Sequence, residues 1–318
     1  MTLLLTEDDV KSLLTIDIAL EAVEEGFRQI AQGSATNSPR TRTRLPNGAL
    51  NIMSAAAPGL DIMGLKTYGV LNGNLVKFYV YLYNTATGSL MALIEASEMG
   101  RVRTGAASGV ATKYLARKDA SSIGILGAGF QAPTQLEAVC RVRNIKSAKV
   151  FNRTRAKGIK FASESSSKLG IDITPVNSPE ECVRDSDIVI TITSSSDPII
   201  LGEWLKPGAH INAAGSNHHK RREIDQETVI RADVVTTDDV DQAKTECGDL
   251  IKPIQQGVIG WENVDKLSDI LVGKSVGRMS DTDITLFESQ GVALEDIVVG
   301  ARLYQLAREK GVGLEISS

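Results

Sequence analysis

The sequence GILGAGFQA at residues 124–132 decides the fold of this chain. An apolar segment runs into a GxGxxA pattern, which is typical of the turn between the first strand and first helix of a dinucleotide-binding fold. Gly127 permits the tight turn, Gly129 lets the backbone approach a pyrophosphate, and Ala132 lets the helix pack on the sheet. The free N–H groups at the start of that helix favour phosphate. We therefore expect this turn to bind a dinucleotide through Gly127, Ala128, Gly129, Phe130 and Gln131.

The sequence around this turn shows two further patterns. After residue 122, strand-like and helix-like segments alternate, which predicts a Rossmann-type doubly wound parallel sheet. Residues 39–95 instead show period-two alternation broken by turn residues, which predicts an antiparallel meander. Residues 16–30 and 291–311 carry apolar residues at helical spacing. The expected fold class is α/β, with the Rossmann sheet accompanied by an α+β domain built on an antiparallel sheet.

The second strand of the parallel sheet leads into VFNRTRAK, residues 150–157, where an NAD-binding fold normally carries an acidic residue. A carboxylate there would repel the 2′-phosphate of NADP. Asn152, Arg153 and Thr154 instead offer donors, and arginine suits bidentate phosphate contacts. The pattern favours NADP(H), while NAD(H) stays possible if Arg153 and Arg155 are ordinary solvated residues.

A later strand of the same sheet ends in TITSSS. Its last residues, Thr193, Ser194 and Ser195, fall at the carboxyl edge, where open α/β sheets bind their ligands. We expect these three residues in the cofactor site.

The composition is that of an ordinary globular protein and argues against several classes of function. The 318 residues carry 39 acidic and 35 basic side chains, so no overall positive field recruits nucleic acid or an anionic membrane. No apolar run approaches the roughly 18 residues that span a bilayer, and the N-terminus lacks the basic start of a secretory signal, so we expect a cytoplasmic protein. The three cysteines and three histidines form neither a disulfide framework nor a metal motif, and we expect no metal.

Several collinear stretches resemble blocks of one family, the ornithine cyclodeaminase/μ-crystallin family, which includes alanine dehydrogenases and cyclic ketimine reductases. They are PRTRTRLPNGALNIMSA, MGLKTYGV, MGRVRTGAASGVATKYLAR, GILGAGFQ, SDIVITITSS, GAHINAAGSN and GVALED. The resemblance implies a homodimer in which the meander domain makes the subunit contact and one wall of the active site. It implies a substrate-binding and dimerisation domain, residues 1–108 and 290–318, and an inserted NADP(H)-binding domain, residues 109–289.

The resemblance also implies residues that bind an amino-acid or imino-acid substrate. Arg40 resembles the family's carboxylate-binding arginine, although Arg42 and Arg44 fall on the same strand face by period two. Arg103 is a second carboxylate-binding candidate, and Thr104 matches a position that touches the cofactor phosphates. The alternative for each arginine is an ordinary solvated charge.

Lys66 is the candidate for proton transfer. It is flanked by Leu65 and Tyr68, so its ammonium is expected to emerge from apolar surroundings. Burial would lower its pKa toward values useful for proton transfer, and a nearby carboxylate would oppose that change. Matching lysines in the family sit beside the substrate, so the resemblance implies that Lys66 binds substrate and acts in catalysis. The alternative is a surface lysine with a buried alkyl chain.

Asn217 departs from the cyclodeaminases, in which the matching aspartate acts in proton transfer. An amide can orient an imine nitrogen or a water, but it cannot exchange a proton. His218 or His219 could replace the lost proton carrier, or both could belong to a solvated basic loop. Gly291 and Val292 resemble family positions that close over the substrate or nicotinamide, although Gly291 could equally form a helix-entry turn.

The chemistry that the resemblance implies is hydride transfer between a nicotinamide and the α-carbon of an amino acid or imine. We expect an NADPH-dependent reductase of small cyclic imino acids, which converts pyrroline-2-carboxylate or piperideine-2-carboxylate to proline or pipecolate. The second expectation is an NAD(P)-dependent dehydrogenase of alanine or an N-alkyl amino acid. An ornithine cyclodeaminase is weakened by Asn217, and a non-catalytic NADPH-binding protein is weakened by the retained Lys66.

Overall fold

The chain folds into two compact units. The structure is a computed structural model that describes residues 1–75 and 77–317, so residue 76 of the expected meander lies outside it. Unit 1 comprises Met1–Arg103 with Val292–Ser318, and unit 2 comprises Thr104–Gly291. The chain passes into unit 2 inside helix α3 (Ser97–Leu115) and returns just before α11 (Ala293–Lys310). The sequence-based boundaries, 108/109 and 289/290, lie a few residues from these crossings.

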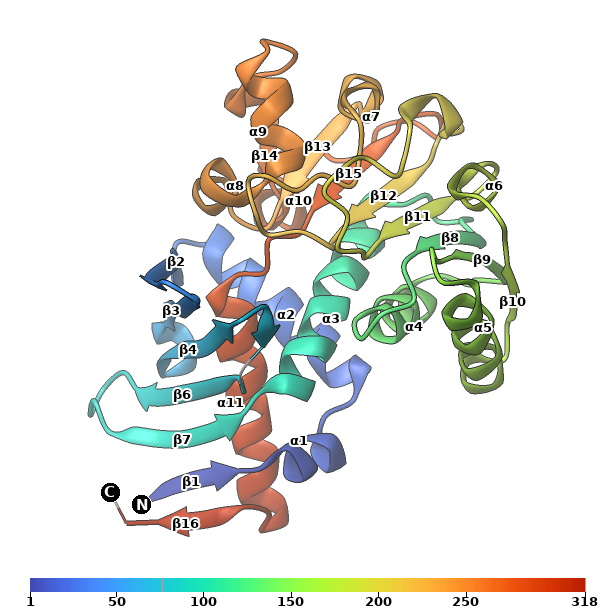
Figure 1. Ribbon diagram of the computed structural model, residues 1–318. Helices are drawn as coiled ribbons and strands as arrows, with labels where there is room; N and C mark the ends of the chain where they lie inside the picture. The colour runs from blue at the N-terminus through green and yellow to red at the C-terminus, as the bar shows by residue number, and fades with distance from the viewer. Residues whose placement is uncertain (76, 318) are drawn as a thin grey trace. The chain divides into compact units, whose positions relative to one another are not determined.

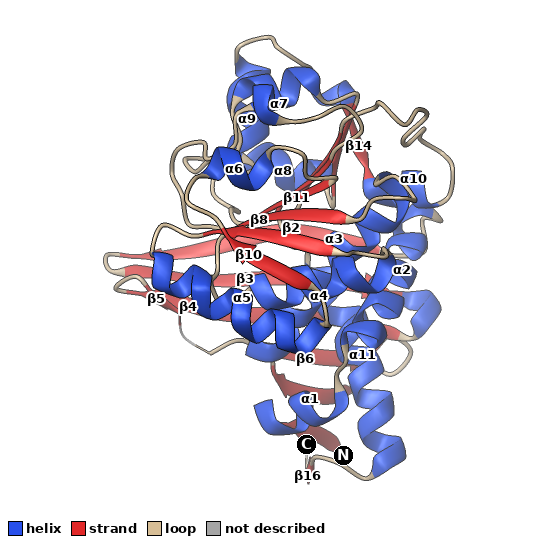
Figure 2. Cartoon of the chain, turned by 90° about the vertical axis from the view of Figure 1, so that its right-hand side faces the viewer, coloured by secondary structure: helices blue, strands red, loops and turns tan. Residues whose placement is uncertain are grey.

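Unit 1 is built on a sheet with the strand order β16-β1-β7-β6-β4-β3-β2, and β5 pairs with β4. Neighbours are antiparallel except β1 and β7, which are parallel. The strands β1 and β16 pair, so the two ends of the chain lie side by side (Figures 1 and 2). The strands are β1 Thr2–Leu5, β2 Thr36–Leu45, β3 Gly48–Ala57, β4 Ile62–Leu71, β5 Asn74–Leu75, β6 Tyr79–Asn84, β7 Leu90–Glu95 and β16 Leu314–Ile316.

Helices α1 (Glu7–Leu13), α2 (Ile16–Ala31) and α11 belong to the same unit, with a short 3-10 turn, Pro58–Leu60. Thr6 caps α1 in a reciprocal capping box with Asp9, because each side chain satisfies a backbone N–H at the helix start. The long helix α11 runs along the sheet and contacts α2, β3 and β4 (Figure 1). A Cβ on Gly64 would lie only 2.7 Å from Ile297 Cδ1, so glycine lets this helix approach β4 closely.

The other side of the unit 1 sheet carries a partly exposed apolar row. Strand residues alternate between faces, and Val80 and Leu82 of β6 are buried while Tyr81 between them is only half-buried. Tyr81 stands opposite Leu65 of β4 and Leu93 of β7, which are half-buried as well. These three residues are called the outer row below.

Unit 2 confirms the expected doubly wound fold. Its strands are all parallel, in the order β10-β9-β8-β11-β12-β15-β13-β14. The order reverses between β8 and β11, which is where such sheets bind ligands. The strands are β8 Ser122–Leu126, β9 Ser147–Phe151, β10 Asp172–Pro175, β11 Ile188–Thr191, β12 His210–Ala213, β13 Val234–Thr237, β14 Val264–Lys266 and β15 Thr285–Glu288.

Both faces of this sheet are apolar and covered. Ile188 and Ile190 of β11 belong to one buried cluster and Val189 to the other, as expected for a strand buried on both sides. Helices α4 and α5 lie next to each other (Figure 2). The helices are α4 Ala132–Val142, α5 Arg155–Leu169, α6 Pro179–Val183, α7 Gln226–Arg231, α8 Val240–Glu246, α9 Gly248–Gln255 and α10 Leu267–Leu271, with 3-10 turns at Gly202–Trp204 and Trp261–Asn263.

The small residues of α3 allow close helix packing. A Cβ on Gly105 would lie 2.4 Å from the carbonyl oxygen of Thr134, so the backbones of α3 and α4 meet directly. None of the helices within the described ranges has the length and hydropathy needed to cross a bilayer. Those ranges also contain no group of three or more His, Cys, Asp and Glu side chains placed to hold a metal ion.

Candidate active site

Lys66 is buried in unit 1 and forms an ion pair with helix α11. It belongs to the face of β4 that packs on this helix, and only 2% of its surface is exposed. Its Nζ donates to Asp296 Oδ1 over 2.9 Å. The ammonium also lies 5.0 Å from the ring centroid of Phe78, which is within cation–π range. The lysine is therefore not a surface residue with a buried alkyl chain.

Arg103 meets the same carboxylate from α3. Its Nε donates to Asp296 Oδ1 over 3.1 Å, and its Nη1 donates to Glu295 Oε2 over 2.5 Å. Two consecutive acids of α11 thus hold the guanidinium. Asp296 Oδ2 is buried and accepts no hydrogen bond from the described part of the chain. Asp296 Oδ1 is the point where the lysine and the arginine converge.

Arg40 is the buried arginine of β2, whereas Arg42 and Arg44 are exposed. The pairing of β2 with β3 shifts register between Ser38 and Thr41, so simple period two does not hold across Arg40. The Arg40 Nε approaches Met53 Sδ at 3.3 Å. The structure thus places Arg40, and not the other two, beside the Lys66 group.

These charges act on each other because they are buried together. The pKa of Lys66 is lowered to about 8 because burial, the largest cause, and the charges of Arg103 and Arg40 outweigh the opposing effect of Asp296. Burial by itself would lower the pKa of Arg103, but Asp296 and Glu295 outweigh it and the pKa is raised. With all five groups ionised, three cations face two carboxylates, a net charge of 3 − 2 = +1. A monoanionic ligand would neutralise this group.

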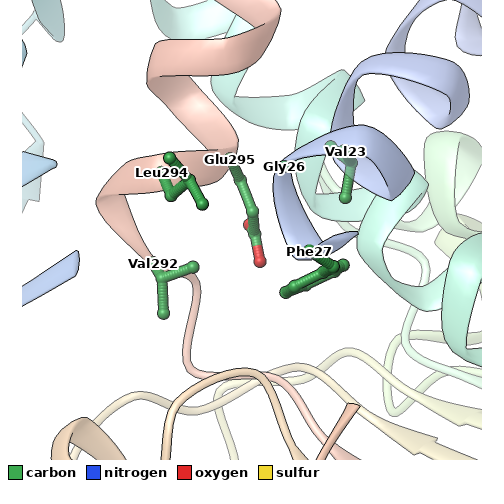
Figure 3. A pocket seen from close by; sticks show the side chains of 6 residues that line it. All are labelled: Val23, Gly26, Phe27, Val292, Leu294 and Glu295. Carbon is green, nitrogen blue, oxygen red and sulfur yellow. The ribbon is translucent and has the colours of Figure 1, made fainter. Parts of the chain in front are cut away.

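A shallow pocket adjoins the Glu295 end of the group. Figure 3 shows the Glu295 carboxylate directed between Phe27 and Val292. Val292, which was expected in the cofactor site, is buried at the start of α11 and lines this pocket. The lining residues are Val23, Gly26, Phe27, Val292, Leu294 and Glu295.

The glycine turn of unit 2 has the geometry of a phosphate-binding loop. Gly127 adopts φ 110°, in the region that favours glycine, and a Cβ there would lie 2.4 Å from the Ile192 carbonyl oxygen. A Cβ on Gly129 would meet nothing within 4 Å, so open space borders the backbone at this point. Phe130 is 63% exposed, and Gln131 precedes the first residue of α4. An open backbone before a helix N-terminus fits the pyrophosphate of a dinucleotide.

The side chain of Asn152 stabilises this glycine turn through hydrogen bonds. Its Oδ1 accepts from the Ala128 N–H over 3.1 Å, and its Nδ2 donates to the Thr154 carbonyl over 2.9 Å. The Asn152 amide thus connects the glycine turn to the end of β9. Arg153, Thr154 and Arg155 are exposed beside it.

The loop after β11 is held by a buried acid that the sequence analysis missed. Glu223 Oε1 accepts from both the N–H and the hydroxyl of Thr193, and Oε2 accepts from the Gly215 N–H over 2.7 Å. Burial raises the pKa of Glu223 while these donors oppose the change. The Thr193 hydroxyl in turn accepts from the Ser195 N–H, and Ser194 is exposed. Glu223 therefore fixes the loops that follow β11 and β12.

The loop before α11 is held in the same way. Asp238 Oδ2 accepts from the N–H groups of Gln290 and Gly291, over 2.8 and 2.7 Å. Gly291 adopts φ 70°, and its carbonyl accepts from Gln242 Nε2. Gly291 thus forms a turn into the helix. Burial raises the pKa of Asp238 to about 6.

The remaining sequence candidates lie elsewhere in unit 2. Thr104 is buried in α3, where its carbonyl accepts from Gln135 Nε2 over 3.1 Å. Asn217 is exposed on the loop after β12. His218 and His219 are exposed and stack on each other with ring centroids 4.6 Å apart.

The structure thus brings the candidates together in two groups. Arg40, Lys66 and Arg103 form the charged group of unit 1, and the glycine turn and Asn152 form the nucleotide group of unit 2. The sequence analysis missed Glu295 and Asp296, although both stand in the quoted GVALED block. Two acids in the otherwise apolar segment 293–301 were the available signal, because buried acids are normally paired.

The chain matches known proteins over most of its length. The family model for the ornithine cyclodeaminase/mu-crystallin family matches residues 1–311. Alanine dehydrogenase of Archaeoglobus fulgidus is 36% identical over 323 residues, which cover 99% of this chain and 98% of that protein. A delta(1)-pyrroline-2-carboxylate reductase of Bacillus cereus is 38% identical over 287 residues, 86% of this chain and 88% of that protein.

Solved structures agree with these relatives. The Thermococcus litoralis delta(1)-pyrroline-2-carboxylate reductase, in complex with NADH and L-proline, has a TM-score of 0.95 at 38% identity and covers 99% of this chain and 100% of its own. An archaeal alanine dehydrogenase dimer with bound NAD has a TM-score of 0.94 at 36% identity and covers 99% of both chains. The motifs, the fold and these relatives together show that the chain belongs to the ornithine cyclodeaminase/mu-crystallin family.

Proposed function

We propose that this protein is an NADPH-dependent reductase of small cyclic imino acids such as pyrroline-2-carboxylate or piperideine-2-carboxylate. The observation that carries the proposal is the buried group of Lys66, Arg103 and Asp296, with Arg40 beside it. The protein is an oxidoreductase acting on CH–NH bonds, like its relatives. The Bacillus cereus and Thermococcus litoralis reductases at 38% identity support the cyclic imine as substrate.

The charged group suits a carboxylated imine. Its net charge of +1 favours one carboxylate, which Arg40 and Arg103 would bind. Lys66 would donate its proton to the imine nitrogen, because a pKa of about 8 keeps it protonated at neutral pH yet able to release the proton. The carbon of the C=N bond gains a hydride and the nitrogen gains this proton, which yields the cyclic amino acid.

The nucleotide group suits the cofactor. A bound NADPH would supply the hydride. The turn at Gly127 and Gly129 would hold the pyrophosphate against the N-terminus of α4, and Arg153 would bind the 2′-phosphate. Asn152 holds the turn in shape through Ala128. The two solved relatives contain NADH and NAD, so they do not support a preference for NADPH. That part of the proposal is argued from Arg153 alone.

An alanine dehydrogenase is the second candidate. The Archaeoglobus fulgidus relative, 36% identical over 99% of this chain, favours it. An open-chain keto acid also carries the carboxylate that the arginines would bind, but ammonia must then be accommodated. Asn217 argues against a cyclodeaminase, because its amide cannot exchange a proton.

We also propose that two copies associate through the outer row of unit 1. Leu65, Tyr81 and Leu93 lie in one line across three strands and stay half-exposed in the single chain. Exposed apolar rows of this kind mark association sites. The archaeal alanine dehydrogenase, which is a dimer, supports this assembly.

Initial rates test the function. Purified protein is assayed with pyrroline-2-carboxylate, piperideine-2-carboxylate, and pyruvate plus ammonia, each with NADPH and with NADH. We expect rapid cyclic-imine turnover, at least tenfold faster with NADPH. Lys66→Met should abolish it, while Lys11→Met, at an exposed lysine paired with Asp8, should not. Turnover confined to pyruvate plus ammonia would replace the proposal by an alanine dehydrogenase.

A further inference from the structure

Asp296 contacts both the lysine that would donate the proton and the arginine that would bind the substrate carboxylate. Its Oδ1 accepts from Lys66 Nζ over 2.9 Å and from Arg103 Nε over 3.1 Å. The side chain is fully buried in the single chain. The proton donor of β4 and the carboxylate-binding arginine of α3 are thus fixed to one oxygen of α11.

We infer that Asp296 is a positioning residue, which sets the distance between the Lys66 ammonium and the Arg103 guanidinium and keeps the lysine charged. The inference rests on the proposed function for what the two cations do to a substrate. It rests on the geometry alone for what Asp296 does to the two cations.

The second acid distinguishes positioning from simple charge balance. Glu295 accepts from Arg103 Nη1, whereas Lys66 pairs with Asp296. If the arginine needed only a counter-charge, Glu295 would provide it. Asp296 is the carboxylate that contacts both cations, so its removal leaves Lys66 without an anionic partner in a buried site.

The surroundings of Lys66 define the expected effect. Arg40 of β2 and Arg103 of α3 are cationic, Tyr68 and Phe78 present their rings, and Asp296 is the acidic neighbour in contact. Replacing Asp296 by asparagine keeps the shape and one acceptor oxygen but removes the negative charge. Glu295 still pairs with Arg103, but Lys66 loses its own anionic partner while both arginines stay near it, so Lys66 should lose its proton at a lower pH.

The first experiment follows the lysine itself, without substrate. Protein labelled with ¹³Cε-lysine is titrated by NMR, and the Lys66 signal is assigned by its loss in Lys66→Met. We expect the titration midpoint of Asp296→Asn to fall by at least one pH unit below that of the unchanged protein. The matched control, Glu295→Gln, should leave the midpoint within a few tenths of a unit. An unchanged midpoint in Asp296→Asn, or equal shifts in both variants, would overturn the inference.

The second experiment separates charge from position. Asp296→Glu keeps the carboxylate but adds a methylene, so the two cations move relative to each other. We expect a titration midpoint near that of the unchanged protein, together with at least a hundredfold loss of kcat on the cyclic imine. Full activity in Asp296→Glu would show that exact placement is unimportant and would refute positioning. This variant also serves if Asp296→Asn does not fold.

The two proposals fail separately. If no imine is turned over but the midpoint of Asp296→Asn falls as expected, the proposed reaction is wrong and the role of Asp296 toward Lys66 stands. If imines are reduced but the midpoint does not move, the reaction stands and the positioning role is wrong.

Discussion

The two glycines of the nucleotide turn should fail in opposite ways when each is replaced by alanine. Gly127 has a positive φ, and its new Cβ would lie 2.4 Å from the Ile192 carbonyl oxygen. That oxygen belongs to a backbone segment held by the bond from Ile192 N–H to the Leu126 carbonyl, so it cannot move freely. The strained φ costs about 1–3 kcal/mol and the overlap about 1–3 kcal/mol.

Gly127→Ala should therefore destabilise unit 2 by about 4 kcal/mol. For a unit of this size, each kcal/mol lowers Tm by about 2–4 °C, which gives a decrease of roughly 10 °C. Gly129→Ala meets no atom within 4 Å and has no positive φ, so its Tm should stay within about 2 °C. Its methyl group instead enters the space expected for the pyrophosphate, and the Kd for NADPH should rise at least tenfold.

Thermal unfolding of the cofactor-free proteins and calorimetric titration with NADPH measure both effects. Lys160→Ala, at an exposed residue of α5, is the control for unspecific loss of stability. A Tm of Gly129→Ala as low as that of Gly127→Ala would refute the division of roles. So would unchanged NADPH affinity in Gly129→Ala, because the open space would then not be the pyrophosphate site.

Three other substitutions address cofactor choice, proton binding and assembly. Arg153→Ala should weaken NADPH about 10- to 100-fold, the value of a charged hydrogen bond, and leave NADH unchanged, with the exposed Lys160→Ala as control in calorimetric titrations. The pKa of Lys66 is lowered from 10.5 to about 8, mainly by burial. Between pH 8 and 10.5 the lysine is therefore protonated in the unfolded chain and neutral in the folded one, so the free energy of unfolding rises with pH. At about 1.36 kcal/mol for each pH unit, urea unfolding should show a rise of about 3 kcal/mol from pH 8 to 10.5 that Lys66→Met lacks. Leu65→Lys should convert a dimer into a monomer in light scattering, whereas Ile159→Lys, at an exposed residue of α5, should not.

The sequence was sufficient for features that depend on neighbouring residues. The parallel sheet was predicted from the alternation of strand-like and helix-like segments after residue 122, because each segment's hydrophobic period is a local property. The burial of Lys66 followed from its apolar neighbours. The family was also recognisable from short collinear motifs, and the family model that matches residues 1–311 confirms it.

Features that depend on distant contacts were not predictable from one sequence. The partner of Lys66 stands 230 residues away, and no periodicity connects β4 with α11. Arg40 could not be separated from Arg42 and Arg44, because a register shift interrupts the alternation on which the prediction relied. Glu223 escaped notice because its role is to accept backbone N–H groups, which leave no mark on the sequence around Thr193.

The placement of both acids on α11 has a consequence for synthesis of the chain. The three cations of unit 1 are made early, but Glu295 and Asp296 follow only after the whole of unit 2. Burying a cation without its partner costs about 3–5 kcal/mol, so unit 1 cannot close around Lys66 and Arg103 before α11 arrives. Unit 2 has all its strands by then and can fold on its own first. A nascent chain should therefore have unit 2 folded while Lys66 and Arg103 are still exposed to water. When α11 is made, it packs on the sheet of unit 1 and supplies Glu295 and Asp296 at the same time.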